Sequence, residues 1–338
     1  VLFDMLIALD KDGKTINLLD NSSISGPFYC PACKSPLRLK KGKIKIPHFA
    51  HISVKNCDSW SENESAQHLG LKLSLYQWFK KKEKVELEKY VPEIKQTADL
   101  LVNDKLAIEI QCSPLSLQRL EERTVSYKEK GYYVLWLQGR DLWLKNNLSS
   151  LQKNLLYYSA VRGFYFWELD WNRKKLRLKS LVYQDLKGRP IYLTEEFDFF
   201  QENLLELLRQ PFREGEDLSL DAPKQEELQL FVQKQLYYQV PKWLKMQEKY
   251  YEQGKNLLDL NWNKSYWSPP GLNLLTFDFS DDTPESFFQV DTPLEKYYHS
   301  FYESFQLQEH EKLHTPSFYA IIKDKNKVKN GEWNGKKT

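Results

Sequence analysis

Three cysteines and two histidines near the start of the chain have the spacing of a zinc site. Cys30 and Cys33 form a Cys-Pro-Ala-Cys knuckle, in which one tight turn presents two thiolates. His51 and Cys57 follow as a His-x5-Cys pair that can complete the four nitrogen and sulfur ligands zinc prefers. His48 competes with His51 for the histidine position. A module with little core material gains folding free energy from a bound ion, so the pattern predicts structural Zn²⁺.

Two other interpretations of this motif are weaker. A redox role needs a helix directly after Cys33, as in thioredoxin-like sites, and none is expected there. The same residues could also be ordinary polar groups of a loop. From Lys34 to Lys55 the chain has seven basic residues and no acidic one. Beside a zinc knuckle this strip predicts a surface that contacts nucleic-acid phosphates, although a charged run is also typical of a solvated face.

A pair of carboxylates is predicted to converge further along the chain. Asp99 lies in one expected strand, and Glu109 and Gln111 lie in the next, two residues apart and therefore on one face. The intervening hairpin brings Asp99 to that face, where two carboxylates and the Ile110 carbonyl suit a hard cation such as Mg²⁺. Burying polar groups in an otherwise apolar strand is costly unless a metal or hydrogen-bond partner compensates. The alternative is a half-buried strand with a solvated polar face.

The helix that precedes these strands carries a polar stripe. Glu64, His68 and Lys72 are spaced at i, i+4 and i+8, so their side chains share one side of the helix. Glu64 is also explained as the capping-box partner of Ser61, and His68 as a surface histidine. The stripe alone is therefore weak evidence for a site.

Hydrophobic periodicity predicts the elements that position these residues. Strands are expected over residues 85–94, 97–102, 106–111 and 132–137, and helices over about 61–82 and 113–131. The order is helix, three strands, helix, strand. On the second helix Arg123 and Tyr127 share one face, from which they could reach a phosphate.

Length and composition limit the classes of protein that fit. The 338 residues suffice for two or three domains: a zinc-finger-like module over 1–60, an α/β domain over 61–140, and a region of unknown role over 141–338 with strands before helices. The net charge of +3 excludes a general polycation, so nucleic-acid affinity must come from a local patch. Four cysteines do not make a disulfide scaffold. Without an apolar run long enough for a bilayer, a soluble cytoplasmic protein is expected.

Together these patterns resemble the competence protein CoiA family and, within it, the PD-(D/E)XK nuclease fold. The resemblance is carried by Cys30-Pro-x-Cys33, Pro47-His48-Phe49-Ala50-His51, Glu64-x3-His68-x3-Lys72, Ala98-Asp99, Glu109-Ile110-Gln111, Tyr127 and the strand ending Trp136-Leu137-Gln138-Gly139. It implies an α/β fold. The core is expected to be restriction-endonuclease-like (α-β-β-β-α-β), with a small zinc-binding module before it and a mixed, mostly helical region after it.

The resemblance also implies roles for individual residues. In the nuclease family the strand carboxylates bind Mg²⁺ (or Mn²⁺) and an acidic residue of the first helix assists, so these roles fall on Asp99, Glu109 and Glu64. The family's usual lysine falls on Gln111, a residue that some members carry and that would position the attacking water. This departure leaves two possibilities: Lys72 supplies the missing charge, or cleavage is slow or absent.

Two functions of different classes follow. The first is a metal-dependent DNA nuclease or processing factor that acts on single-stranded or branched DNA in natural transformation, alongside a recombinase of the RecA type. In this hypothesis Lys72 or His68 stabilises the charge that develops on the phosphate. The second is an inactive nuclease scaffold that serves as a DNA-binding adaptor for the recombinase. Gln111 favours the second hypothesis, and the intact pair Asp99 and Glu109 favours the first.

Overall fold

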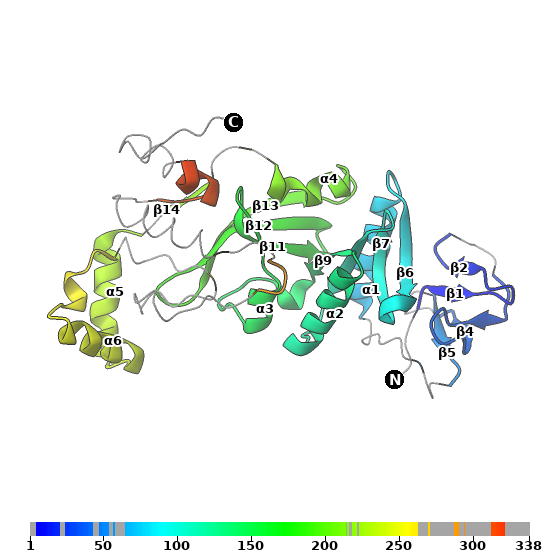
Figure 1. Ribbon diagram of the computed structural model, residues 1–338, viewed down its shortest axis with the longest axis horizontal. Helices are drawn as coiled ribbons and strands as arrows, with labels where there is room; N and C mark the ends of the chain where they lie inside the picture. The colour runs from blue at the N-terminus through cyan, green and yellow to red at the C-terminus, as the bar shows by residue number, and fades with distance from the viewer. Residues whose placement is uncertain are drawn as a thin grey trace, which may run out of the picture. The chain divides into compact units, whose positions relative to one another are not determined.

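We describe the protein from a computed structural model (Figure 1). The structure describes residues 5–20, 24–42, 47–53, 57, 65–213, 215, 218–221, 223–262, 270, 287–290, 294 and 312–321. Packing divides the chain into two compact units. The first comprises residues 1–143, 167–178 and 195–209, and the second comprises 144–166, 179–194 and 210–338. Both candidate sites lie in the first unit.

The N-terminal module is a small antiparallel sheet. Its strands are β1 (Ile7–Leu9), β2 (Thr15–Asn17), β3 (Phe28–Tyr29), β4 (Pro36–Lys40) and β5 (His48–His51), in the spatial order β2-β1-β3-β4-β5. Two backbone hydrogen bonds between Met5 and Phe49 also join the start of the chain to β5, so the sheet curls back on itself. The buried cluster inside consists of Ala8, Phe28, Cys30, Leu37 and Phe49. Such a core is small for an independent fold.

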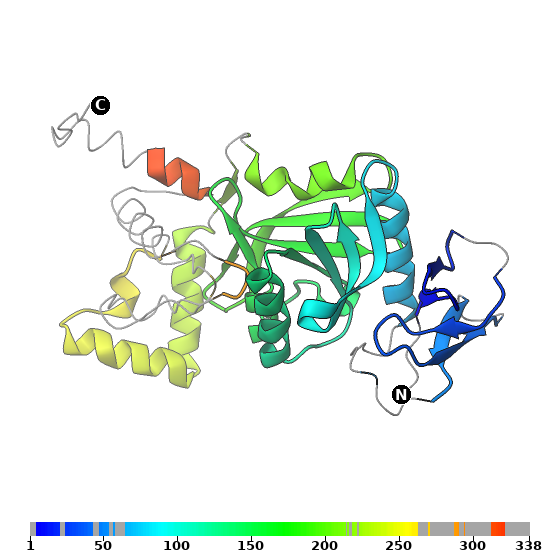
Figure 2. The same cartoon turned by 45° about the vertical axis from the view of Figure 1, so that its right-hand side comes forward.

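The next elements occur in the predicted order of helix, three strands, helix and strand. They are α1 (Ala66–Phe79), β6 (Val85–Val91), η1 (Pro92–Ile94), β7 (Gln96–Val102), β8 (Leu106–Gln111), α2 (Leu117–Glu129), β9 (Tyr133–Gln138) and η2 (Arg140–Leu142). Helix α1 packs against β6, β7 and β8, and α2 packs against β9 (Figure 2). Strand β8 pairs antiparallel with β7 and parallel with β9.

The starts of both helices differ from the prediction. Ser65 caps α1 by accepting a hydrogen bond from the amide of His68 (3.1 Å), and the predicted capping box Ser61–Glu64 lies outside the described residues. Helix α2 begins after Ser116, whose side chain accepts from the amide of Arg119 (3.3 Å), and not at Ser113. Serines at neighbouring positions are equally good caps by type, so sequence alone does not choose between them.

Strands after residue 140 continue this sheet. They are β10 (Tyr157–Ser159), β11 (Gly163–Asp170), β12 (Lys175–Gln184) and β13 (Pro190–Asp198), preceded by α3 (Ser150–Asn154). The spatial order is β13-β12-β11-β9-β8-β7-β6, with β10 paired to β11. Strand β11 runs parallel to β9 and places Glu168 beside Gln138. The division of the chain into three domains stays a prediction, and the sheet itself crosses residue 140.

The remainder of the described chain is mixed. It contains α4 (Leu204–Leu208), η3 (Gln210–Phe212), β14 (Ser219–Asp221), α5 (Gln225–Tyr237), α6 (Pro241–Glu252), η4 (Leu257–Asp259) and β15 (Lys312–His314). The rings of Phe231, Trp243 and Trp262 pack edge to face between these helices. None of the helices in the described ranges is both long enough and apolar enough to cross a membrane.

Gly70 lets α1 approach the rest of the first unit closely. A Cβ atom at this position would lie 2.4 Å from the ring of Trp171. We expect Gly70→Ala to destabilise the protein by about 1–3 kcal/mol, because the overpacking outweighs the better helix propensity of alanine. Urea unfolding measures the change. Gly42→Ala is the control, since no atom lies within 4 Å of its added Cβ, and equal effects of the two substitutions would contradict the packing argument.

Candidate active site and metal centre

The predicted zinc ligands come together in the N-terminal module. The ligand atoms of Cys30, Cys33, His51 and Cys57 all lie within 4.8 Å of one another. Cys33 Sγ is 3.3 Å from His51 Nε2, and the sulfur atoms of Cys30 and Cys57 are 4.0 Å apart. The four cysteines of the chain are all free thiols. Three sulfurs and one imidazole at these distances could hold one metal ion.

The register of β5 distinguishes the two histidines. His51 pairs with Leu37 on β4, the strand that follows the knuckle, and is 1% exposed. His48 lies three residues earlier on the same strand, so its side chain emerges from the opposite face. The geometry therefore brings His51 and not His48 to the three sulfurs.

The thiols of this cluster differ in acidity. Burial raises the pKa of Cys30 to about 12. Burial also acts to raise the pKa of Cys33, but hydrogen bonds involving Ser35, His51 and Cys57 outweigh it and lower the pKa to about 6. Cys33 is thus the thiolate already present at neutral pH, and a bound cation would favour deprotonation of the others.

Asp99 is a residue of β7, and its side chain contacts both helix α1 and strand β8. Its Oδ1 is 3.1 Å from Lys72 Nζ, and its Oδ2 is 3.1 Å from His68 Nε2. The same Oδ2 accepts a hydrogen bond from the backbone amide of Ile110 (2.9 Å). Burial opposes ionisation, but Lys72, His68 and this amide hold the pKa of Asp99 well below its usual range. Asp99 is therefore a permanently charged group at neutral pH.

Glu109 faces helix α2. Its Oε2 accepts from Arg123 (2.7 Å) and its Oε1 from the hydroxyl of Tyr127 (2.8 Å). Arg123 and Tyr127, which were predicted to share one face of the helix, therefore both donate hydrogen bonds to the same carboxylate. Burial raises the pKa of Glu109 to about 7 against the opposing effect of Arg123, and the charge of Asp99 adds to the rise.

The raised pKa of Glu109 predicts how stability depends on pH. A carboxyl whose pKa rises from 4.5 to about 7 on folding binds a proton more tightly in the folded state. Its contribution is complete below pH 4.5 and is lost as the pH rises through about 7, by up to about 3 kcal/mol. Folding lowers the pKa of Asp99, so the contribution of Asp99 to stability changes with pH only below its ordinary pKa of 3.8.

Urea unfolding between pH 5 and 8 without added Mg²⁺ measures this loss. The parent protein is expected to lose stability as the pH rises through this range, and Glu109→Gln to show a flatter profile. Parallel profiles for the two proteins would show that Glu109 titrates normally.

Glu88 is a site residue that the sequence-based argument missed. The pairs Leu87–Leu100 and Lys89–Ala98 place Glu88 opposite Asp99 across β6 and β7. The pair Leu100–Ile108, continued by one residue, places Asp99 opposite Glu109. Three carboxylates therefore form a row across three neighbouring strands. Pairing the strands outward from the short connection after Val91 could have placed Glu88 opposite Asp99 from the sequence. Its burial could not be predicted, because polar and apolar residues do not alternate regularly along β6.

Of two further residues of the predicted site, the structure describes Gln111 but not Glu64. Gln111 is 4% exposed, and its side-chain amide donates to the carbonyl of Ser113 (2.8 Å) in the loop after β8. Glu64 lies outside the described residues. The structure thus brings His68, Lys72 and Asp99 into direct contact and holds Glu109 with Arg123 and Tyr127, while Gln111 is engaged by its own loop.

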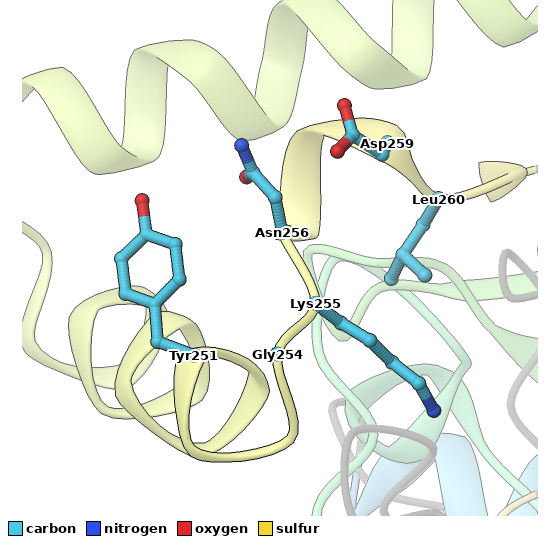
Figure 3. A pocket seen from close by; sticks show the side chains of 6 residues that line it. All are labelled: Tyr251, Gly254, Lys255, Asn256, Asp259 and Leu260. Atoms are coloured by element: carbon cyan, nitrogen blue, oxygen red, sulfur yellow. The ribbon is translucent and has the colours of Figure 1, made fainter.

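A hollow in the second unit does not have this chemistry. Tyr251, Gly254, Lys255, Asn256, Asp259 and Leu260 line it (Figure 3). The Asn256 side chain accepts from the amide of Leu258 and from Gln247, so it is used to hold the turn at η4. One lysine and one aspartate without a second titratable pair do not suggest a reaction there.

Two family models match the chain. The model of the competence protein CoiA N-terminal domain matches residues 12–59, and that of the CoiA nuclease-like domain matches residues 64–210. The curated Competence protein CoiA of Bacillus subtilis (strain 168) is 30% identical over an alignment of 188 positions, and the match covers 51% of this chain and 50% of that relative. The chain thus spans about half the length of that relative. No solved structure matches the chain.

These matches define the class of protein: a mixed α/β chain with a nuclease-like domain behind a small Cys/His module. The nuclease-like match includes β11, β12 and β13 and ends at residue 210, beyond the limit expected at 140. The chain belongs to the competence protein CoiA family.

Proposed function

We propose that the chain is a Mg²⁺-dependent DNA nuclease that processes incoming DNA in natural transformation. The observation that carries the proposal is the pairing of Asp99 with Glu109 across neighbouring strands, Glu109 2% exposed and Asp99 14% exposed, each beside a cationic side chain. The succession of α1, β6, β7, β8, α2 and β9 around them supports a PD-(D/E)XK core. The role in competence rests on the family and on the name of the Bacillus relative.

The donor set fits a divalent cation in its chemistry. Asp99 and Glu109 lie opposite each other on β7 and β8, and the charge of Asp99 helps to raise the pKa of Glu109. An ion such as Mg²⁺ (or Mn²⁺) would relieve this repulsion. His68 and Arg123, which are 14% and 12% exposed, contact the carboxylates now and would have to yield these contacts to a bound ion. Asp99 and Glu109 would hold the ion, which when bound polarises the phosphate and acidifies a water molecule.

The residues around the carboxylates have roles of their own. Lys72 is 1% exposed and sits against Asp99, so it supplies a fixed positive charge beside the phosphate. His68 lies at the more open side of Asp99 and could donate a proton to the leaving oxygen. The assisting role of Glu64 and the water-positioning role of Gln111 belong to the same proposal.

The N-terminal module would bind structural Zn²⁺ and present the basic strip to DNA. Its cysteines and His51 support the ion, and Lys34, Arg38, Lys40 and Lys41 lie on or beside β4. Single-stranded or branched DNA in the cytoplasm is the proposed substrate, and a recombinase of the RecA type is the proposed partner. Phosphate contacts of this kind weaken steeply with salt.

A second function is favoured by a specific observation. The carboxylates of Asp99 and Glu109 are already compensated by Lys72 and Arg123, and Gln111 stands where the nuclease family has lysine. A site neutralised in this way could persist without metal in a DNA-binding adaptor that recruits a recombinase. The two functions differ in whether the carboxylates are needed for chemistry.

Cleavage of labelled DNA by the purified chain tests the proposal. Single-stranded and branched substrates are incubated with Mg²⁺ or Mn²⁺, and zinc content is measured on the same sample. Cleavage that depends on the divalent ion supports the nuclease. Binding of DNA without cleavage under every condition contradicts it and favours the adaptor. In cells, a double alanine variant at Asp99 and Glu109 that still supports transformation would also favour the adaptor.

A further inference from the structure

Glu88 connects the N-terminal module to the candidate active site. Its Oε2 accepts hydrogen bonds from the backbone amides of Leu6 (2.7 Å) and Ile7 (3.2 Å). Its Oε1 accepts from Lys72 Nζ (3.0 Å), and Lys72 in turn contacts Asp99 (3.1 Å). Glu88 is 7% exposed. An unbroken series of hydrogen bonds and ion pairs thus runs from the backbone at the start of β1 to Asp99.

The backbone of Glu88 is unusual for a residue with a side chain. Its φ angle is +46°, in the left-handed region, and the ladder between β6 and β7 pairs Leu87 and Lys89 but skips Glu88. Such a conformation costs free energy and persists where the surroundings hold it in place. Both oxygens of Glu88 accept hydrogen bonds, Oε2 from the module and Oε1 from Lys72. These contacts explain why the strained conformation is kept.

The connection joins parts of the chain that are distant in sequence. Glu88 lies 82 and 81 residues after Leu6 and Ile7, which are 1% and 5% exposed. Ile7 begins β1, and the same small sheet carries His51 of the metal cluster on β5. The strand that contacts Glu88 therefore belongs to the sheet that carries the candidate metal cluster.

We infer that Glu88 is a positioning residue that holds Lys72 against Asp99 only while the N-terminal module is docked. Lys72 is buried between two carboxylates, so loss of one of them changes where its charge sits. The module would in this way control the active site without touching the substrate. The part of this inference that concerns catalysis rests on the proposed nuclease function, and the link between module and Lys72 does not.

Glu88→Gln tests the inference against a matched control on the same strand. Glu86→Gln changes an acid two residues away that is 37% exposed and pairs with Lys89 (2.6 Å). Amide hydrogen exchange at Leu6 and Ile7 is expected to become about tenfold faster in Glu88→Gln, because a charge-assisted hydrogen bond is lost. The kcat for DNA cleavage is expected to fall by about tenfold to a hundredfold with KM unchanged, since Glu88 does not reach the substrate. Glu86→Gln should leave all three quantities at parent values.

Lys72→Met provides a readout that does not depend on activity. If Lys72 holds Glu88 in place, its removal also speeds exchange at Leu6 and Ile7, whose amides donate to Glu88. Exchange at the parent rate in Lys72→Met overturns the link, whether or not the chain cleaves DNA. Faster exchange in Glu88→Gln with unchanged kcat overturns the positioning role. A parent protein that does not cleave contradicts the proposed function instead, and the exchange rates alone then decide the link.

Discussion

Removal of the zinc ion that we propose for the Cys30, Cys33, His51 and Cys57 cluster is expected to unfold the N-terminal module while the nuclease-like domain stays folded. The apparent binding free energy of a structural zinc ion is about 10–16 kcal/mol. Among the described residues, the buried cluster of the module consists of Ala8, Phe28, Cys30, Leu37 and Phe49, and Cys30 is itself a candidate ligand. Burial of this small core cannot replace a contribution of that size to the folding free energy.

Cys33→Ser is the variant that tests this expectation, because hydrogen bonds lower the pKa of the Cys33 thiol to about 6 and its sulfur lies 3.3 Å from His51 Nε2. Metal analysis and amide exchange along β3, β4 and β5 measure the result. Cys112→Ser is the matched control: Cys112 is buried beside Gly139 and takes no part in the cluster. Retained protection of the three strands in metal-free Cys33→Ser would show that the ion has no structural role.

Asp99→Asn is expected to lower the rate of DNA cleavage by a factor on the order of a thousand. Asparagine has the same shape and can still accept the hydrogen bond from the amide of Ile110. It lacks the charge that a divalent ion requires and that now holds Lys72 and His68. Steady-state cleavage of labelled DNA at saturating Mg²⁺ measures the rate.

The control for this prediction is Asp104→Asn in the same hairpin. Asp104 lies in the exposed turn between β7 and β8 and pairs with Lys84 at the surface. Its substitution should leave cleavage unchanged. Comparable rates for the parent protein and Asp99→Asn, with the fold intact by circular dichroism, would remove Asp99 from the proposed site.

The strands that carry the site were the most predictable part of the fold. The bounds of β8 agree with the predicted residues 106–111, because an apolar run between a tight turn and a helix cap leaves little choice. Left-handed backbone at Asn103 and Asp104 suits the turn that was expected there. Similarly, ligand spacing predicted Cys30, Cys33 and Cys57 and favoured His51, but His48 stayed a competitor until the register of β5 distinguished the two histidines.

The rest of the fold could not be predicted because it depends on pairing between strands that are distant in the sequence. Nothing local in β11 indicates that this strand lies parallel to β9, since an apolar run is compatible with any sheet. Glu88 was missed for a related reason: its importance depends on the register of three strands and on a backbone angle that is rare outside glycine. Partners of the predicted residues were also hidden, because the contacts of Arg123 and Tyr127 with Glu109 depend on how α2 meets the sheet.

The alignment of Glu88, Asp99 and Glu109 on three neighbouring strands depends on the lengths of two surface turns. Residues 92–95 join β6 to β7, and residues 103–105 join β7 to β8. One residue added to or removed from either connection would slide a strand by one position and turn its side chains to the other face. Relatives that carry this site should therefore vary in the composition of both turns but not in their length.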